Sequence, residues 1–138
     1  MKISSWCALG LVGLLAACAT PMSSAVSEAN KQMELKGSPF RYRAVDDSSM
    51  TLTLLPLPVG PSKAVPALAQ QALESIATQE GRKGRSVVNL EEVRHLQDGR
   101  EVWVLKTLGE GVAYIVAFAS PSQPGTDIRI TGPTVYAK

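Results

Sequence analysis

Apolar and polar positions alternate along much of the chain beyond residue 36, and a period of two predicts β-strands. Residues 40–45 and 50–55 are two such stretches. The short oxygen-bearing side chains at residues 46–49 favour a turn between them, because they can hydrogen-bond to the local backbone. Proline cannot donate to a strand ladder, so the proline-rich stretch 56–61 ends the pairing. The pattern therefore predicts a β-hairpin.

One stretch follows the helical period instead. Pro66 suits the first turn of this helix, where an amide has no intrahelical partner. Gly81 is expected at the left-handed position that ends the helix, with Arg82 and Lys83 near the negative end of its dipole. The apolar positions that form one face of the predicted helix are Val65, Leu68, Ala69, Ala72, Leu73, Ile76 and Ala77.

The rest of the chain is rich in strand patterns. Strands are expected at residues 86–97, 101–108, 112–119 and 127–131, with a short edge at 134–136 left open. The alternation slips at Glu91-Glu92, which suggests a bulge, and Asp98-Gly99 favours a tight hairpin. Residues 112–119 are apolar on both faces, which predicts a central strand whose small, alanine-rich face lies toward the helix.

The N-terminal region has a different pattern. Lys2 precedes an apolar run across residues 3–15, which is too short to cross a bilayer as a mature helix and predicts a cleaved export signal. The Leu-Ala-Ala-Cys sequence ending at Cys18 resembles the lipobox of bacterial lipoproteins, in which the cysteine thiol is joined to diacylglycerol and becomes the first residue. By this resemblance, residues 1–17 are a signal peptide and Cys18 carries the lipid.

The residue after the cysteine directs sorting of lipoproteins in enteric bacteria, where aspartate retains the protein in the inner membrane. Ala19 stands at that position, so the resemblance implies the periplasmic face of the outer membrane. Residues 18–35 are small, polar and weakly patterned, which predicts a flexible tether with a reach of roughly 20–25 Å. Residues 36–138 are then expected to form a single periplasmic domain.

The predicted order is two strands, one helix and three or four further strands. This order favours an α+β fold, with a twisted antiparallel sheet of about five to six strands and the amphipathic helix packed on one face. It is similar to the order in PsbP/Mog1-like domains, which also occur in small bacterial lipoproteins. The similarity covers roughly residues 38–135 and rests on element order alone. It implies a binding or assembly role and carries over no catalytic residues.

Length and composition limit the classes of protein. About 120 residues remain after the signal, enough for one modest domain. Cys7 leaves with the signal and Cys18 is committed to lipid, so the mature domain has no cysteine for a disulfide or a zinc site. Loss of Lys2 lowers the formal net charge from +2 to +1, and this near-neutrality argues against nucleic acid as a partner.

Few residues suit catalysis or metal binding. His95 is the only histidine and is expected on a strand, where a surface or half-buried position is favoured over a catalytic base. Glu91 and Glu92 would point to opposite faces of a strand, and Asp46-Asp47 lacks further oxygen ligands at suitable spacing. The glycines at 109 and 111 fit a turn rather than a phosphate loop. We therefore expect no metal, no cofactor and no enzymatic activity.

Basic side chains are the first candidates for binding. Arg82, Lys83 and Arg85 form the densest charge of the mature chain, which fits either contact with anionic lipid or an acidic partner, or a solvated helix end. Arg41 and Arg43 share the outward face of the first predicted strand and would extend a basic patch.

Trp103 is the only tryptophan of the mature chain. The pattern leaves open whether it belongs to the core or is an exposed anchor on the sheet. An exposed position beside Tyr42 would make a protein-binding spot.

These features predict a non-enzymatic, membrane-anchored lipoprotein that binds an envelope protein through a sheet face or edge. Small lipoproteins that pilot secretins are similar in size, lipobox and largely β build. The alternative is a carrier for a small apolar ligand or lipid, with a cavity between helix and sheet. A cavity of several hundred cubic ångströms would favour the carrier, and an open edge or a flat apolar patch would favour the interaction module.

Overall fold

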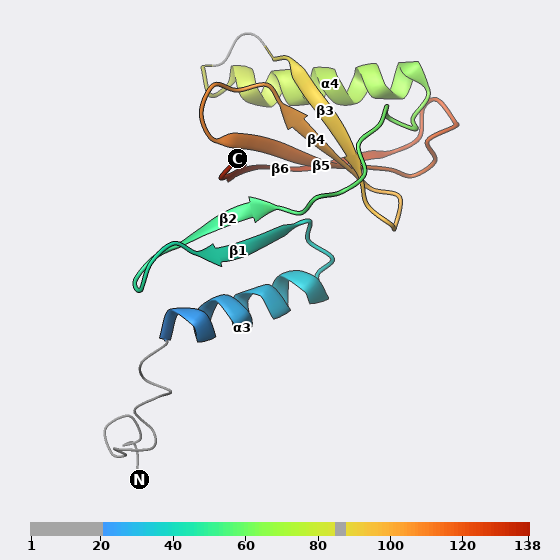
Figure 1. Ribbon diagram of the computed structural model, residues 1–138. Helices are drawn as coiled ribbons and strands as arrows, with labels where there is room; N and C mark the ends of the chain where they lie inside the picture. Colours follow the sequence, from blue (N-terminus) through green and yellow to red (C-terminus); the bar gives the residue numbers. More distant parts are fainter. Residues whose placement is uncertain (1–20, 85–87) are drawn as a thin grey trace, which may run out of the picture. The chain divides into compact units, whose positions relative to one another are not determined.

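The computed structural model describes residues 21–84 and 88–138, and in these residues it is an α+β protein with two helices and six strands (Figure 1). The strands form two separate antiparallel sheets, one of two strands and one of four. The chain divides into two compact units with the boundary between Thr53 and Leu54, whereas the sequence predicted one domain from residue 36. The predicted signal peptide, the lipidation site Cys18 and the basic residue Arg85 lie outside the described residues.

The first unit consists of a helix followed by a hairpin. Helix α3 (Pro21–Leu35) lies beside β1 (Phe40–Ala44), which pairs with β2 (Met50–Leu54). The predicted hairpin is confirmed, but the prediction of a flexible tether is wrong for residues 21–35. Val26, Asn30 and Met33 share one half-buried side of α3, and burial of such a side against a neighbour stabilises a helix of weak intrinsic pattern.

The second unit is a four-stranded meander with a helix on one face. The sheet order is β3 (Leu90–His95), β4 (Glu101–Leu105), β5 (Gly111–Phe118) and β6 (Ile128–Tyr136). Helix α4 (Pro66–Gly81) runs across this sheet (Figure 1). The single sheet of five to six strands expected from the sequence is not confirmed, because the proline-rich segment before α4 separates the hairpin from the meander.

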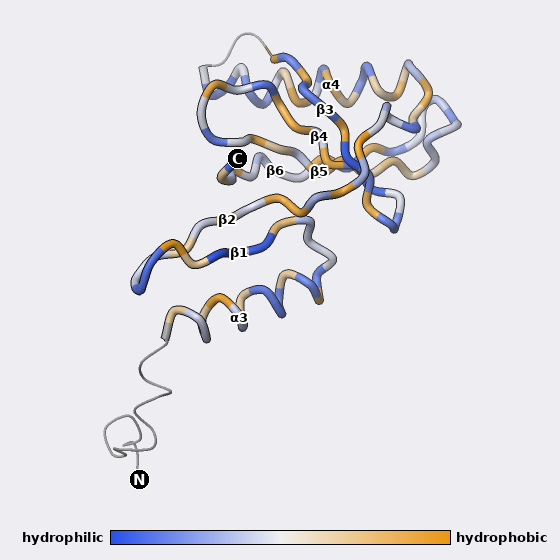
Figure 2. Tube along the Cα trace, in the orientation of Figure 1, coloured by the Kyte–Doolittle hydropathy of each residue, from blue (hydrophilic) through white to orange (hydrophobic). Residues whose placement is uncertain are grey.

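The hydrophobic core lies between α4 and the sheet. Ala72 and Ile76 from the helix pack with Trp103 of β4 and with Tyr114 and Val116 of β5. Figure 2 shows hydrophobic residues concentrated along β4 and β5, the two central strands. The central position predicted for residues 112–119 is therefore confirmed.

The face of β5 under the helix is the large one. Val112, Tyr114 and Val116 belong to the core cluster with α4, whereas Ala113 lies on the opposite face of the strand. The prediction that the small face lies under α4 is wrong. The helix itself supplies the small residue, Ala72, and this leaves room for bulky side chains from the sheet.

Two local predictions on the sheet are confirmed. The β3–β4 register shifts between Leu90 and Glu92, so Glu91 is the bulged residue. The turn after β3 contains Gly99 with φ of 94°, a backbone conformation that suits glycine.

The two ends of α4 differ in how well they were predicted. Pro66 begins the helix, as expected. Gly81 is its last residue but does not take the left-handed conformation, which Gly84 adopts with φ of 89°. The chain continues through one more turn, in which the Gly84 amide donates to the Gly81 carbonyl, so the reversal comes three residues later.

Candidate functional site

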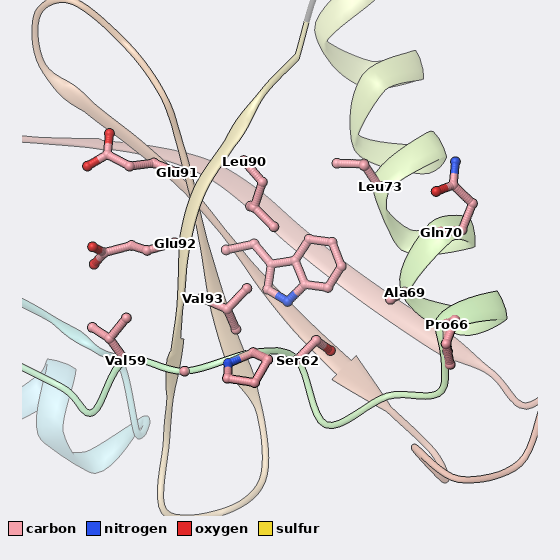
Figure 3. A pocket seen from close by; sticks show the side chains of 13 residues that line it. Val59, Ser62, Pro66, Ala69, Gln70, Leu73, Leu90, Glu91, Glu92 and Val93 are labelled. Atoms are coloured by element: carbon pink, nitrogen blue, oxygen red, sulfur yellow. The ribbon is translucent and has the colours of Figure 1, made fainter.

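A pocket opens between α4 and β3. The backbone of α4 lies closest to β6, at the far side of the sheet, and this offset leaves space beside β3. The pocket has a volume of about 570 Å³ (Figure 3). It is lined by Val59, Gly60, Pro61, Ser62, Pro66, Ala69, Gln70, Leu73, Leu90, Glu91, Glu92, Val93 and Trp103.

The floor and two walls of the pocket are apolar. Trp103 is only 2% exposed and lines the pocket as its floor. Leu73 and Ala69 line it on the α4 side and Leu90 on the β3 side (Figure 3). Glu91 and Glu92 also line the pocket, but their carboxylates extend to the side of β3 away from α4 (Figure 3). The inner surface therefore favours an apolar group over a charged one.

Residues 58–63 form the third wall, and we call them the pocket loop. This loop adds to the outer edge of β3: the Gly60 amide donates to the Val93 carbonyl at 3.0 Å, and the His95 amide donates to the Pro58 carbonyl at 2.9 Å. Val59 and Arg94 form the corresponding antiparallel bridge. The loop thus protects one half of an edge strand, and the bulge at Glu91 interrupts the other half.

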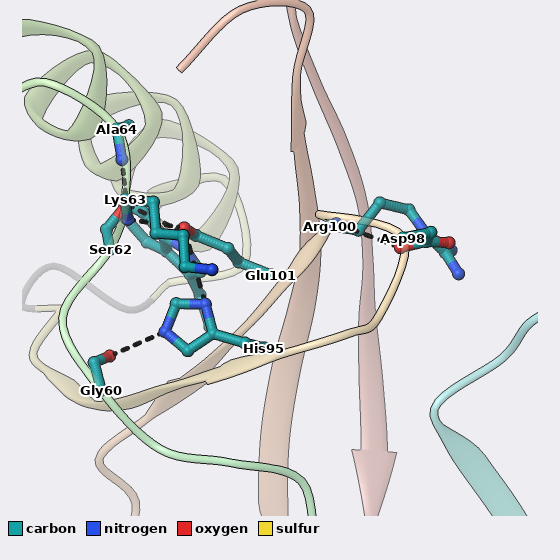
Figure 4. Close-up of polar contacts among 9 residues, drawn as sticks. Gly60, Ser62, Lys63, Ala64, His95, Asp98, Arg100 and Glu101 are labelled. Atoms are coloured by element: carbon teal, nitrogen blue, oxygen red, sulfur yellow. Dashed lines mark hydrogen bonds and ion pairs between the residues drawn. The ribbon is translucent and has the colours of Figure 1, made fainter. Parts of the chain in front are cut away.

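A buried carboxylate fixes the pocket loop to the floor. Glu101 of β4 is 2% exposed and accepts hydrogen bonds from the Ser62 hydroxyl, the Lys63 amide and the Trp103 indole N–H, each at 2.8 Å (Figure 4). Three donors compensate the cost of burying the charge. The Glu101 side chain therefore fixes the position of both Trp103 and the pocket loop, which line the pocket.

His95 lies beside this carboxylate. Its Nε2 atom is 3.2 Å from the Gly60 carbonyl oxygen, and its Nδ1 atom is 3.9 Å from a Glu101 carboxylate oxygen (Figure 4). The Ser62 hydroxyl donates to the Glu101 carboxylate, and this contact holds the pocket loop in place. The half-buried strand position expected for His95 is confirmed.

The opposite face of β3 carries a separate charge pair. The Arg94 guanidinium donates to the Glu92 carboxylate and also to the Leu55 carbonyl, at 3.0 Å for the latter. Burial raises the pKa of the Tyr136 phenol above its ordinary value, Arg94 acts in the opposite direction, and Glu92 and Glu91 reinforce the increase. These groups stabilise the sheet behind the pocket.

Two turn carboxylates have lowered pKa values. Hydrogen bonds from Ser48 and Ser49 hold the pKa of Asp46 below its usual value. Partial burial acts to raise the pKa of Asp98, but hydrogen bonds and the positive charge of Arg100 outweigh it, so this pKa is also lowered. Both carboxylates support turns and lie outside the lining of the pocket.

The sequence-predicted basic residues fall in different units. Arg41 and Arg43 lie on β1 in the first unit, and Arg82 and Lys83 follow α4 in the second. Arg85 lies outside the described residues.

Two of these basic side chains have intramolecular partners. Arg41 donates to the carbonyls of Ser38 and Phe40 at 2.6 and 2.7 Å. The Lys83 ammonium is 3.7 Å from the carboxylate of the buried residue Glu80. Arg41 therefore stabilises its own strand, and Lys83 supports the end of α4.

Trp103 belongs to the core. The structure decides between the two positions that the sequence left open, and the exposed protein-binding spot beside Tyr42 is not formed by this buried side chain. It forms the floor of the pocket. Glu101 was missed, although an acid within the apolar segment Glu-Val-Trp-Val-Leu indicates a buried, hydrogen-bonded carboxylate.

Comparison of the chain with protein-family models, with curated proteins and with solved structures gave no match. Neither helix in the described part of the chain has the length and apolar character needed to cross a membrane. Across residues 21–84 and 88–138, no three His, Cys, Asp or Glu side chains are grouped so that they could hold a metal ion.

Proposed function

We propose that this chain is a lipid-anchored, non-catalytic binding protein of the bacterial cell envelope, in which the pocket between α4 and β3 receives an apolar side chain of a partner protein. The pocket is the observation that carries the proposal. Its lining is largely apolar, and the hydroxyl of Ser62, one of its polar lining residues, is engaged with Glu101 in holding the pocket loop.

The rim of the pocket supports a protein partner. Val59 lines the pocket, is 61% exposed and extends from the loop on the outer side (Figure 3). A buried anchor side chain surrounded by further apolar contact is typical of binding hot spots. Because the pocket lies beside β3, the first strand of the sheet, and Val59 and Gln70 of its lining are exposed, a protein segment can approach it from solvent.

The anchor half of the proposal rests on the sequence that ends at Cys18. Two or more acyl chains on that cysteine hold a protein stably on a membrane, whereas a single chain binds marginally. Because Ala19 follows this cysteine, the location that we propose is the periplasmic face of the outer membrane. The protein would then present its pocket to other envelope components from a fixed surface.

A second function has its own support. The pocket volume of about 570 Å³ lies within the range of small-molecule sites, and its lining is largely apolar. A carrier for a small apolar ligand or lipid would use the same space without a protein partner. The two functions differ in the occupant of the pocket of the membrane-anchored protein, which is a side chain of a partner protein in the first and a small apolar ligand or lipid in the second.

The experiment that tests the proposal is crosslinking in intact membranes, followed by affinity purification of tagged protein and mass spectrometry of both proteins and lipids. The control is Cys18→Ala, which removes the lipid attachment site. We expect one enriched envelope protein with the wild type and its loss with Cys18→Ala. Enrichment of a lipid without any protein would overturn the partner proposal and support the carrier.

A further inference from the structure

Strand β6 is the edge strand of the four-stranded sheet at the end opposite β3 (Figure 1). In the described part of the chain, β6 pairs with β5 on one side and with no strand on the other. Its register with β5 is regular across residues 128–131. Pro133 has no amide to donate, so the first part of β6 is the part that suits a further strand. We call residues 127–131 the free edge.

The backbone groups of the free edge alternate between the two sides of the strand. The Ala119 amide donates to the Asp127 carbonyl at 2.9 Å, so the polar backbone groups of Asp127 point toward β5. Arg129 lies two residues further along in the same register, and its backbone groups point the same way. The amides and carbonyls of Ile128 and Ile130 therefore point outward, where another strand can bind them.

The free edge carries one charge of each sign on the same face of the strand. Asp127 and Arg129 are two positions apart and both exposed, and within the described residues neither forms an ion pair. A hollow of about 590 Å³ is lined by residues 117–119 and 127–130, so the surroundings of the two charges are open. Two neighbouring charges of opposite sign complement a second copy of the same edge when the two copies run antiparallel.

The alternation of the backbone selects one register for such a pair. A two-fold axis at Ile128 places this residue opposite itself and places Asp127 opposite Arg129 of the second copy, twice by symmetry. Ile128 then forms the hydrogen-bonded pair, and both charge pairs fall at the non-hydrogen-bonded positions, where side chains lie closer together. An axis at Arg129 would oppose two guanidinium groups, and an axis at Ile130 would oppose Arg129 to Thr131.

We propose that the free edge binds a second copy of this chain: two β6 strands pair antiparallel about Ile128, and two Asp127–Arg129 ion pairs join the copies. The half-buried side chains of Ile128 and Ile130, which pack against the core, lose further exposed apolar surface in this pairing. The inference goes beyond the proposed function and does not rest on it. The pocket lies beside β3 at the other edge of the sheet, so each dimer presents two open pockets.

Charge reversal with rescue tests the interface. The mass of the detergent-solubilised full chain is measured by light scattering across a range of concentrations for the wild type, Asp127→Arg, Arg129→Asp and the double variant. We expect a dimeric wild type, and dimerisation weakened by roughly tenfold in each single variant, because two attractive pairs become two like-charge pairs. The double variant exchanges the charges and should restore the dimer. Asp47→Arg, an exposed position of the first unit, is the matched control and should leave the dimer unchanged.

Three results would contradict the proposed dimer. A wild type that stays monomeric throughout would mean that the two charges protect an open edge from other strands. A dimer that is indifferent to both single reversals would place the contact elsewhere on the chain. Single variants that dissociate without rescue in the double variant would show that Asp127 and Arg129 do not face each other across the interface.

Discussion

Gly111 and Tyr136 are directly opposed at one end of the β5–β6 ladder. Tyr136 is 6% exposed, and a Cβ atom placed on Gly111 would lie 2.3 Å from its ring. The tyrosine therefore occupies the space that any other side chain at position 111 would need. This contact makes Gly111 a packing requirement of the sheet rather than only a turn residue.

We predict that Gly111→Ala lowers the free energy of unfolding by about 1–3 kcal/mol, because the buried ring must move away from its packed position. Gly109→Ala is the matched control, since nothing lies within 4 Å of a Cβ placed at that glycine. Urea denaturation of the detergent-solubilised protein measures both variants. Equal stability of the two would show that the tyrosine moves without cost.

At the scale of elements, one side chain attaches α3 to β1. The Asn30 side-chain oxygen accepts from the Tyr42 amide at 2.7 Å, and its amide nitrogen donates to the Tyr42 carbonyl at 3.0 Å. The asparagine thus makes the pair of hydrogen bonds that a neighbouring strand would make. It protects the edge of β1 from other strands.

Asn30→Ala is expected to increase the amide exchange rate of Tyr42 by roughly tenfold, because both backbone groups lose their partner. Gln32→Ala, an exposed position on the same helix, should leave that rate unchanged. Exchange measured by NMR at the single amide distinguishes the two variants. An unchanged rate in Asn30→Ala would mean that α3 protects the strand by other contacts.

The sequence correctly predicted those features that are determined by residues close together along the chain. The Asp98-Gly99 turn, the bulge at Glu91 and the apolar stripe of α4 each depend on residues close along the chain. Helix α3 was missed because its stability comes from burial of one side, which includes the contact between Asn30 and β1, and such contacts are not visible in the pattern of residues 18–35.

The candidate site depends on contacts between distant segments. The Ser62 hydroxyl meets Glu101 across 39 positions, and Trp103 becomes a pocket floor only because α4 is offset toward β6. Alternation along β4 could assign a face to Trp103 but not decide whether that face is covered. The sequence therefore predicted a cavity between helix and sheet only as one of two alternatives, and it did not predict the residues that line it.

At the scale of the whole molecule, the proposed lipid anchor changes the affinity that the pocket needs. A protein held on a membrane meets partners in the same membrane at a raised effective concentration, so a single apolar anchor residue can suffice. The central claim is thus that the pocket between α4 and β3 binds an envelope protein in the membrane.

The most direct measurement places a photoreactive residue at Gln70, an exposed residue on the pocket rim, and identifies crosslinked proteins in intact cells. It is repeated in Ala69→Phe, which fills the pocket, and in Ala67→Phe, which adds the same ring at an exposed position of α4. We predict one crosslinked envelope protein that persists in Ala67→Phe and disappears in Ala69→Phe. A crosslink that survives Ala69→Phe unchanged, or the absence of any crosslinked protein, would contradict the claim.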